Sequence, residues 1–244
     1  MLLSYGYYGR MGYGMGMFFD PTMIFVLIGL VLSLMASGMV KSTFAKYSRV
    51  RSMSGLTGAQ AAERILHRAG IYDVSIARVS GHLTDHYDPR TKTLRLSEAT
   101  YGAASVAAVG VAAHECGHAI QHQQRYAPLV LRSTLVPAAN LGSSLAWPIF
   151  LIGLIASLPA LTTAGILLFG LAVLFQLVTL PVEINASRRA VGLLESTGVL
   201  GHTENKGVKK VLTAAALTYV ASLAASILQL VRLLILAGGR RSND

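Results

Sequence analysis

The sequence predicts a mainly α-helical membrane protein, with four transmembrane helices and a small α+β domain on one membrane face. Of its 244 residues, 53% are hydrophobic and only 13% are charged, which is unusual for a soluble domain of this length. The excess lies in four apolar stretches of about 20 residues, the length that a helix needs to cross the hydrocarbon core of a bilayer. These stretches are residues 21–40, 138–158, 162–180 and 211–237.

The residues in and around these stretches predict how the membrane helices are arranged. The first follows a Tyr/Gly/Met-rich segment, residues 1–19, in place of a short basic region, and no small-residue cleavage site comes after it. It is therefore predicted to be a signal anchor, with residues 1–19 flexible. Only a few residues around Pro159 separate the second and third stretches, which predicts a tight hairpin. The fourth stretch carries Arg232 near its end, where the long side chain is expected to reach the membrane surface.

The net charge of +10 is concentrated on one side of the predicted membrane. Seventeen of the 21 Lys and Arg residues lie in residues 41–137 and 181–210, and four membrane crossings put both stretches on the same face. The positive-inside rule predicts that this face is cytoplasmic and that both termini are outside. No RNA- or DNA-binding motif accompanies the charge, so nucleic acid is not an expected partner. Attraction to the anionic headgroups of the lipid bilayer is a sufficient explanation.

The segment after the first membrane helix predicts a small α+β domain. A basic connector over residues 41–54 leads to Thr57, which is expected to cap a helix over residues 58–69 through a capping box with Gln60. Residues 74–79 and 92–97 alternate apolar and polar side chains, as strands do, and residues 84–90 are expected to form a turn between them. The strands either support the next helix or hold an extended peptide along an exposed edge.

The run His114-Glu115-Cys116-Gly117-His118 lies within a predicted helix over residues 106–123, which Ser105 is expected to cap. Residues four apart share one helix face, so both imidazoles can bind a single metal ion, with Glu115 beside a metal-bound water. This H-E-x-x-H arrangement is that of zinc peptidases. The alternative interpretation is a helix with two hydrogen-bonded core histidines. Cys116 lies about 200° around the helix from His114, so it is expected to pack as a small apolar side chain rather than as a metal-bound or redox-sensitive thiol.

A catalytic zinc ion takes a third protein ligand. His122 diverges by about 80° from His114 around the helix, so it is expected near the mouth of the site and not as a ligand. Glu183 follows the third membrane stretch on the same face as the motif, where a carboxylate needs a metal or a cation. The alternative for Glu183 is an ion pair with Arg188 or Arg189. Other acidic and His residues are expected in solvated loops or turns, and of these His86 can face the cleft: Glu195, Glu204, His202, Asp85, His86 and Asp88.

Nearly the whole chain from Phe18 onward resembles the YugP-like neutral zinc metallopeptidases of bacterial membranes. The resemblance is carried by Phe19-Asp20-Pro21, Ser42-Thr43-Phe44, Gly55-Leu56-Thr57-Gly58, Leu83-Thr84-Asp85-His86-Tyr87-Asp88-Pro89, Val111-Ala112-Ala113-His114-Glu115, Gly117-His118-Ala119-Ile120-Gln121, Thr179-Leu180-Pro181-Val182-Glu183 and Ala214-Ala215-Ala216-Leu217-Thr218-Tyr219. It implies a zincin-like peptidase domain of the gluzincin type in a bacterial inner membrane. It also implies that His114, His118 and Glu183 bind Zn²⁺ and that Glu115 is the general base.

The chain is also distantly similar to the HtpX and CAAX-processing membrane peptidases, in which the third ligand begins a Glu-x-x-Ala-Asp stretch. Here that stretch is Glu183-Ile184-Asn185-Ala186-Ser187, with serine in the place of the aspartate. The contact between that aspartate and a ligand histidine is therefore in doubt, and Asn185 or Ser187 is expected to supply a weaker substitute.

The predicted function is zinc-dependent hydrolysis of peptide bonds in membrane or juxtamembrane protein substrates. Zinc lowers the pKa of its water, Glu115 takes the proton, and Arg188, His122 and His86 are the candidate donors to the developing oxyanion. Two alternatives remain open at this level. One is an intramembrane protease of the site-2 type, and the other is a non-enzymatic membrane scaffold with a structural zinc site. The sequence does not indicate an oligomeric state.

The predicted organisation follows from these elements. A flexible N-terminus (1–19) precedes the first transmembrane helix (20–40), the peptidase domain (41–137) and a transmembrane hairpin (138–182). A loop or helix with the third metal ligand (183–210), the fourth transmembrane helix (211–237) and a tail (238–244) complete the chain.

Overall fold

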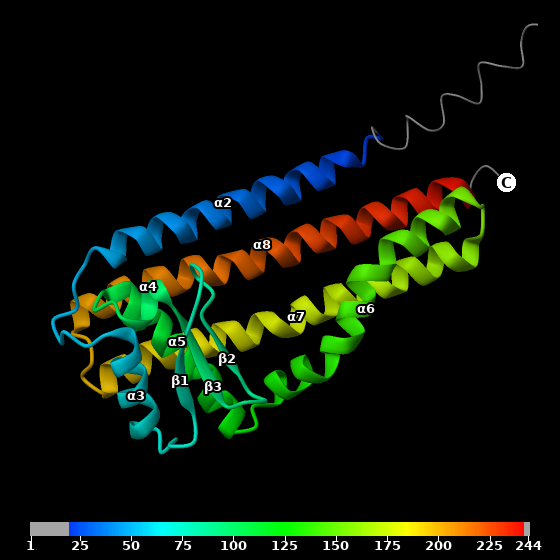
Figure 1. Cartoon of the computed structure of the whole chain (residues 1–244). Coiled ribbons are helices and arrows are strands. Elements are labelled where there is room, and N and C mark those ends of the chain that lie inside the picture. The colour runs from blue at the N-terminus through cyan, green and yellow to red at the C-terminus, as the bar shows by residue number, and fades with distance from the viewer. Residues whose placement is uncertain (1–19, 242–244) are drawn as a thin grey trace, which may run out of the picture.

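A computed structural model describes residues 20–241 of the chain (Figure 1). Residues 1–19, which are predicted to be flexible, and the last three residues of the tail lie outside the described residues. Within them, four helices are long and apolar enough to cross a membrane. They are α2 (Met23–Ser48), α6 (Ala127–Ile155), α7 (Pro159–Ser196) and α8 (His202–Arg241). The prediction of a mainly α-helical protein with four membrane-spanning helices is confirmed.

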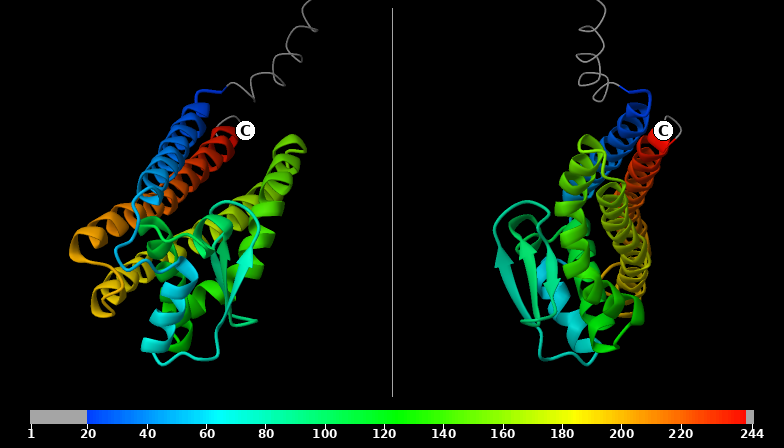
Figure 2. Two further views of the ribbon diagram at one scale, coloured as in Figure 1. Left: turned by 60° about the vertical axis from the view of Figure 1, so that its left-hand side comes forward. Right: turned by 90° about the vertical axis from the view of Figure 1, so that its right-hand side faces the viewer.

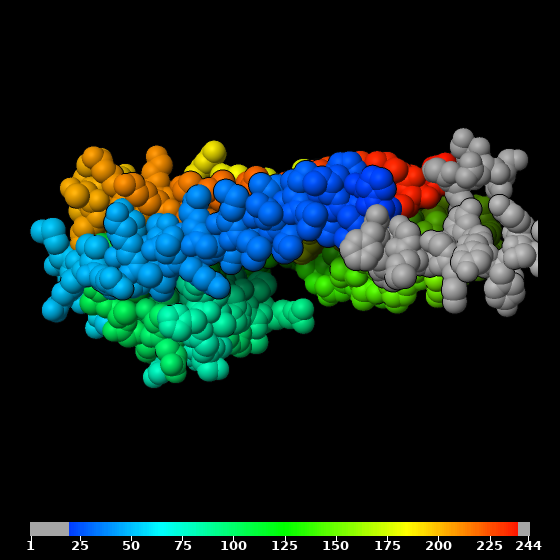
Figure 3. Space-filling model, turned by 90° about the horizontal axis from the view of Figure 1, so that it is seen from above, coloured from blue at the N-terminus to red at the C-terminus, as the bar shows by residue number. Residues whose placement is uncertain are grey.

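The four long helices lie side by side, with α8 packed between α2 and α7, and α6 packed against α7 (Figure 1). The turn between α6 and α7, the start of α2 and the end of α8 are together at one end of the bundle. The remaining helices and the strands are at the other end, where they protrude from one side of the bundle (Figures 2 and 3). This arrangement places the two basic stretches of the sequence at the same end.

All four helices extend beyond the apolar stretches that predicted them. Helix α2 continues to Ser48 through residues that were expected to form a connector, and α6 begins at Ala127, well before residue 138. Helix α7 continues to Ser196, so residues 183–196 are helical, and α8 begins at His202 instead of in a loop. Hydropathy marks only the apolar part of a helix, because polar residues on a helix already formed do not end it.

Two side chains that were predicted at the membrane surface or in a solvated loop are held by specific contacts. Arg232 is only 6% exposed, and its guanidinium donates to Asp20 Oδ2 at 3.0 Å and to Thr22 Oγ1 at 3.2 Å. Asp20, just before the start of α2, thus supplies a carboxylate that the hydropathy pattern does not reveal. The Arg232 side chain turns toward this carboxylate. Glu204 lies in the first turn of α8 and accepts hydrogen bonds from the backbone N–H groups of Met53 and Gly201, both at 2.8 Å.

The small domain consists of α3 (Gly58–Arg68), β1 (Ser75–Val79), β2 (His86–Asp88), β3 (Thr93–Ser97), α4 (Glu98–Tyr101) and α5 (Val106–Gln123). The predicted capping box of Thr57 with Gln60 is present, and the Ser105 side chain caps α5. The strands form a sheet in the order β1-β3-β2, with β1 parallel and β2 antiparallel to β3. Residues 84–90 are therefore not only a turn, since β2 lies within them. A three-residue strand is too short to show an alternating pattern.

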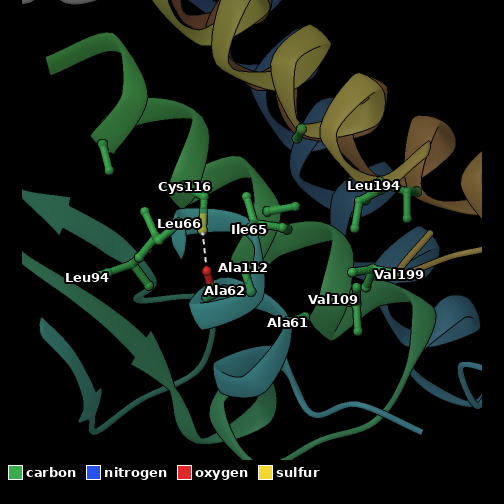
Figure 4. Close-up of a cluster of buried hydrophobic side chains, with 14 of the residues drawn as sticks. Ala61, Ala62, Ile65, Leu66, Leu94, Val109, Ala112, Cys116, Leu194 and Val199 are labelled. Atoms are coloured by element: carbon green, nitrogen blue, oxygen red, sulfur yellow. Dashed lines mark hydrogen bonds between the residues drawn. The ribbon is translucent and has the colours of Figure 1, made fainter. Parts of the chain in front are cut away.

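Helix α5 is buried along most of its length, because it packs against α3, α7 and α8. Cys116 is fully buried in the core between α5 and α3, and its thiol donates to the Ala62 carbonyl at 3.6 Å (Figure 4). Burial raises the pKa of this thiol well above its usual value, so it stays neutral. The prediction that Cys116 packs as an apolar side chain is confirmed.

Candidate metal centre

Two helices bring together three side chains of the type that bind metal ions. Helix α5 contributes His114 and His118 from successive turns, and α7 contributes Glu183, which is only 3% exposed. One ligand atom from each of the three lies within 4.8 Å of the others. Glu183 Oε2 lies between the two imidazoles, 3.3 Å from His114 Nε2 and 3.4 Å from His118 Nε2.

These distances fit the donor set of a zinc ion. Donor atoms at about 2.0–2.1 Å from a tetrahedral zinc ion lie about 3.3 Å from one another. The two separations between Glu183 Oε2 and the histidine nitrogens, 3.3 and 3.4 Å, agree with this spacing. Two imidazole nitrogens and one carboxylate oxygen are also the ligand types of catalytic zinc, which keeps its fourth position for water. The residues present therefore fit a catalytic zinc site.

Gly117, between the two histidines, allows α7 to come this close to α5. A Cβ atom at this position would lie 2.7 Å from the backbone oxygen of Ala186, which is closer than real Cβ contacts. Ala186 is one helical turn after Glu183 on α7. The glycine in the motif is thus a packing requirement, because any larger side chain pushes α7 and its carboxylate away from the histidines.

Both histidines are oriented by hydrogen bonds at Nδ1, which leaves Nε2 directed at Glu183. His114 Nδ1 is 3.1 Å from Ser187 Oγ, and His118 Nδ1 is 3.0 Å from Gln121 Oε1. Ser187 therefore occupies the role for which the sequence suggested Asn185 or Ser187. Partners of this kind fix the ring orientation and tautomer of metal-binding histidines.

The protonation of His118 follows from a chain of hydrogen bonds that begins at Arg189. Arg189 Nε donates to Asn185 Oδ1 at 2.7 Å, which identifies this atom as the amide oxygen of Asn185. That oxygen and the Val182 carbonyl accept from the Gln121 amide nitrogen, both at 2.9 Å. The remaining oxygen of Gln121 can only accept, so His118 Nδ1 must carry a proton. His118 Nε2 then faces Glu183 Oε2 at 3.4 Å, so either a proton on Nε2 or a metal ion is needed between the two atoms.

The charges of the site favour a cation at this position. Burial lowers the pKa of His118, but the hydrogen bond to Glu183 and the charge of Glu115 outweigh burial and raise it. In electrostatic terms, the two carboxylates attract positive charge to the point at which the Nε2 atoms converge. A proton on His118 or a metal ion meets this requirement, and a metal ion satisfies both histidines at once.

The second oxygen of Glu183 has a partner that the sequence did not suggest. Arg132, near the start of α6, donates from Nη1 to Glu183 Oε1 at 3.0 Å. The predicted alternative, an ion pair of Glu183 with Arg188 or Arg189, is absent among the described residues, since Arg189 bonds to Asn185 and Gln124 instead. The carboxylate is therefore held between a guanidinium on one oxygen and the two histidines on the other.

Glu115 follows His114 on α5 and lines the cavities at this cluster. Its side chain is buried, with 7% exposure, yet its carboxylate makes no hydrogen bond or ion pair with the described part of the chain. It lines two cavities that meet at the candidate site, one of about 680 Å³ and one of about 200 Å³. Its oxygens are not among the fully buried side-chain atoms that lack a partner in the described residues, so the carboxylate is open to these cavities.

The larger of these cavities is a polar cleft. It is lined by the edge strand β2, by α5 and by the start of α6, and Arg132 and His86 are among its lining residues. Strand β2 pairs only with β3 in the described structure, so its outer edge keeps backbone groups that can pair with an extended peptide.

Of the three oxyanion donors suggested by the sequence, only His86 lines a cavity at the candidate site. His86 lines the polar cleft, although its Nδ1 bonds to the Thr84 carbonyl at 2.8 Å. His122 is 2.9 Å from Tyr87 Oη and lines a separate cavity of about 840 Å³, and Arg188 lines neither cavity at the site. Tyr219 from α8 lines both cavities beside Glu115. Tyr219 is not recognisable as a site residue from its local sequence, because an isolated tyrosine on an apolar helix carries no catalytic signal.

Comparisons with known proteins show the family of the chain. The model of the family described as "Putative neutral zinc metallopeptidase" matches residues 22–238. The chain belongs to this family. A protein of Bacillus subtilis (strain 168), described as "Putative membrane protease YugP", is 48% identical over 225 residues, which make up 91% of this chain and 100% of the relative. No solved structure matches the chain. The predicted family resemblance is confirmed, and the chain is a membrane protein of a zinc metallopeptidase family.

Proposed function

We propose that this protein is a membrane-bound zinc metallopeptidase that hydrolyses peptide bonds in membrane or juxtamembrane protein substrates. His114, His118 and Glu183 would hold the zinc ion, and Glu115 would be the general base. The observation that carries the proposal is the convergence of two oriented imidazoles on one buried carboxylate oxygen, at 3.3 and 3.4 Å, next to an unpaired glutamate. The family match supports the same chemistry.

Three residues of the chain have separate roles in the proposed reaction. Zinc, when bound, supplies a water of lowered pKa and polarises the scissile carbonyl. Glu115 would accept a proton from the attacking water and would pass it to the amine nitrogen as the C–N bond breaks, a role that suits a carboxylate without other partners. Arg132 keeps Glu183 in place through Oε1. Tyr219, whose side chain lines both cavities, is the candidate donor to the oxyanion that develops on the carbonyl.

The polar cleft supports a polypeptide as the substrate. Its volume of about 680 Å³ and the open edge of β2 suit an extended chain held by backbone hydrogen bonds. The basic end of the helix bundle supports a cytoplasmic position of the peptidase domain in a bacterial inner membrane, by the positive-inside rule.

Two observations favour this function over the alternatives. Helix α5 is not one of the four candidate membrane spans in residues 20–241, whereas a site-2 intramembrane protease places this motif within the bilayer. A structural zinc site uses four protein ligands, and the cluster found among the described residues has three.

The decisive experiment compares the full-length protein with Glu115→Gln, purified in detergent. We expect about one zinc ion per chain in both by elemental analysis, cleavage of a peptide library by the unaltered protein, and loss of cleavage by at least a thousandfold in the variant. Glu63→Gln, an exposed change of the same kind on α3, is the matched control and should cleave normally. Retained cleavage by Glu115→Gln would remove Glu115 from the role of base, and absence of zinc from the unaltered protein would refute the proposal.

A further inference from the structure

The second cavity at the candidate site is an apolar crevice between α2, α5 and α8. We propose that this crevice is the specificity subsite of the enzyme, and that it takes an aliphatic side chain from a substrate residue next to the scissile bond. The inference rests on the proposed function. The crevice reaches His114, Glu115 and Glu183 at its inner end, so whatever enters it lies directly beside the reacting atoms.

The walls of the crevice are apolar side chains from elements far apart in the sequence. Helix α2 contributes Val40 and Phe44, α5 contributes Val111, and the loop before β2 contributes Leu83. Helix α8 adds further apolar residues, among which the two alanines leave the free space: Val211, Leu212, Ala215 and Ala216.

The polar groups in the crevice, apart from those of the proposed machinery, are already paired. Thr218 Oγ1 donates to the Ala215 carbonyl at 2.6 Å, so its hydroxyl proton is already used. Asp85 accepts from the backbone N–H and the hydroxyl of Ser97, at 2.8 and 2.9 Å. A polar substrate side chain placed here would lose its water without gaining a partner, whereas an aliphatic one loses nothing. The crevice therefore selects against polar residues.

The crevice and the polar cleft meet at the metal centre and differ sharply in character. They share His114, Glu115 and Glu183, and the cleft adds His118 with charged and polar groups such as His86, Asp88 and Arg132. A peptide that spans both is polar on one side of the scissile bond and apolar on the other. The crevice also lies where α2 and α8, two candidate membrane spans, enter the domain. The substrate class is thus a polypeptide cut at the boundary between an apolar and a polar segment.

The size of the crevice suits a single side chain. Its volume is about 200 Å³. Leucine-sized groups fit in this space, whereas a helix does not. In such pockets one methylene changes specificity by roughly tenfold or more.

The test uses fluorogenic peptides that differ only in the residue on either side of the cleaved bond, with Gly, Ala, Val, Leu or Asp at that position. With the full-length enzyme, we expect kcat/KM to rise at least a hundredfold from Gly to Leu on one side, and Asp there to prevent cleavage. Ala216→Leu, which fills the crevice, should lower the Leu-to-Gly ratio of kcat/KM at least tenfold. Thr213→Leu, which adds similar bulk at an exposed position of α8, is the control and should keep the ratio.

A binding measurement separates this inference from the proposed function. Zinc-loaded Glu115→Gln should bind the Leu peptide at least tenfold more tightly than the Gly peptide, by fluorescence anisotropy, whether or not turnover is found. If Ala216→Leu does not fold, Ala215→Val provides the same comparison with a smaller change. Equal binding and cleavage of Gly and Leu peptides would overturn the inference while leaving the peptidase intact. Loss of the preference in lipid nanodiscs, but not in detergent, would identify an acyl chain as the occupant and would also overturn it.

Discussion

The contact of α5 with α7 at Gly117 predicts the effect of adding one methyl group. In Gly117→Ala, the new Cβ would lie 2.7 Å from the Ala186 oxygen, whereas ordinary contact begins at 3.4 Å. The atom it meets is backbone, so the helices themselves must separate by about 0.7 Å. Glu183 lies one turn away on α7 and moves with Ala186.

The displacement acts directly on the proposed ligand distances. The separations of 3.3 and 3.4 Å between Glu183 Oε2 and the histidines would widen toward about 4 Å, beyond the spacing of about 3.3 Å for zinc donors. Loss of the contacts that hold a metal ligand in position typically lowers metal affinity by about 10–100-fold. We therefore expect zinc affinity to fall at least tenfold, measured by competition with a chromophoric chelator.

Gly192→Ala on α7 is the matched control, because a Cβ there meets nothing within 4 Å. It should leave zinc affinity unchanged and, if anything, stabilise α7, since alanine favours the helix over glycine. Zinc affinity in Gly117→Ala equal to that of the unaltered protein would refute the reasoning. The close approach of α7 would then play no part in holding Glu183 at the site.

Two further predictions concern the support of the centre and of the bundle. Gln121→Leu removes the acceptor that fixes the His118 tautomer, so zinc affinity should fall about 10–100-fold by the same competition assay, whereas the exposed change Gln123→Leu should have no effect. Unchanged zinc binding in Gln121→Leu would show that the tautomer is fixed elsewhere. Asp20→Ala leaves the buried guanidinium of Arg232 without its carboxylate, which should cost about 3–5 kcal/mol and lower the Tm followed by circular dichroism in detergent. The double variant with Arg232→Met should recover most of the loss, and an unchanged Tm in Asp20→Ala would contradict the ion pair.

Local properties of the chain were predictable from the sequence. Hydropathy located the four spans, because burial in lipid demands an uninterrupted apolar run whatever the neighbours are. Helical periodicity placed His114 and His118 on one face, and side-chain chemistry identified the caps Thr57 and Ser105. Each of these depends on one continuous segment of the chain, of a few residues for a cap and about 20 for a span, so no knowledge of packing was needed.

The H-E-x-x-H run and its family resemblance also pointed to Glu183, but only the tertiary structure shows that its oxygen lies between both imidazoles. The partners Arg132, Gln121 and Tyr219 come from three different helices, and nothing in their local sequence distinguishes them from other polar residues. Their positions depend on how α5, α6, α7 and α8 pack, down to the absence of a Cβ at Gly117. Such contacts join residues far apart in the chain, so periodicity and hydropathy cannot specify them. The sequence by itself determined the metal-binding motif and the membrane spans, and the packing of the helices decided the rest of the site and its apolar crevice.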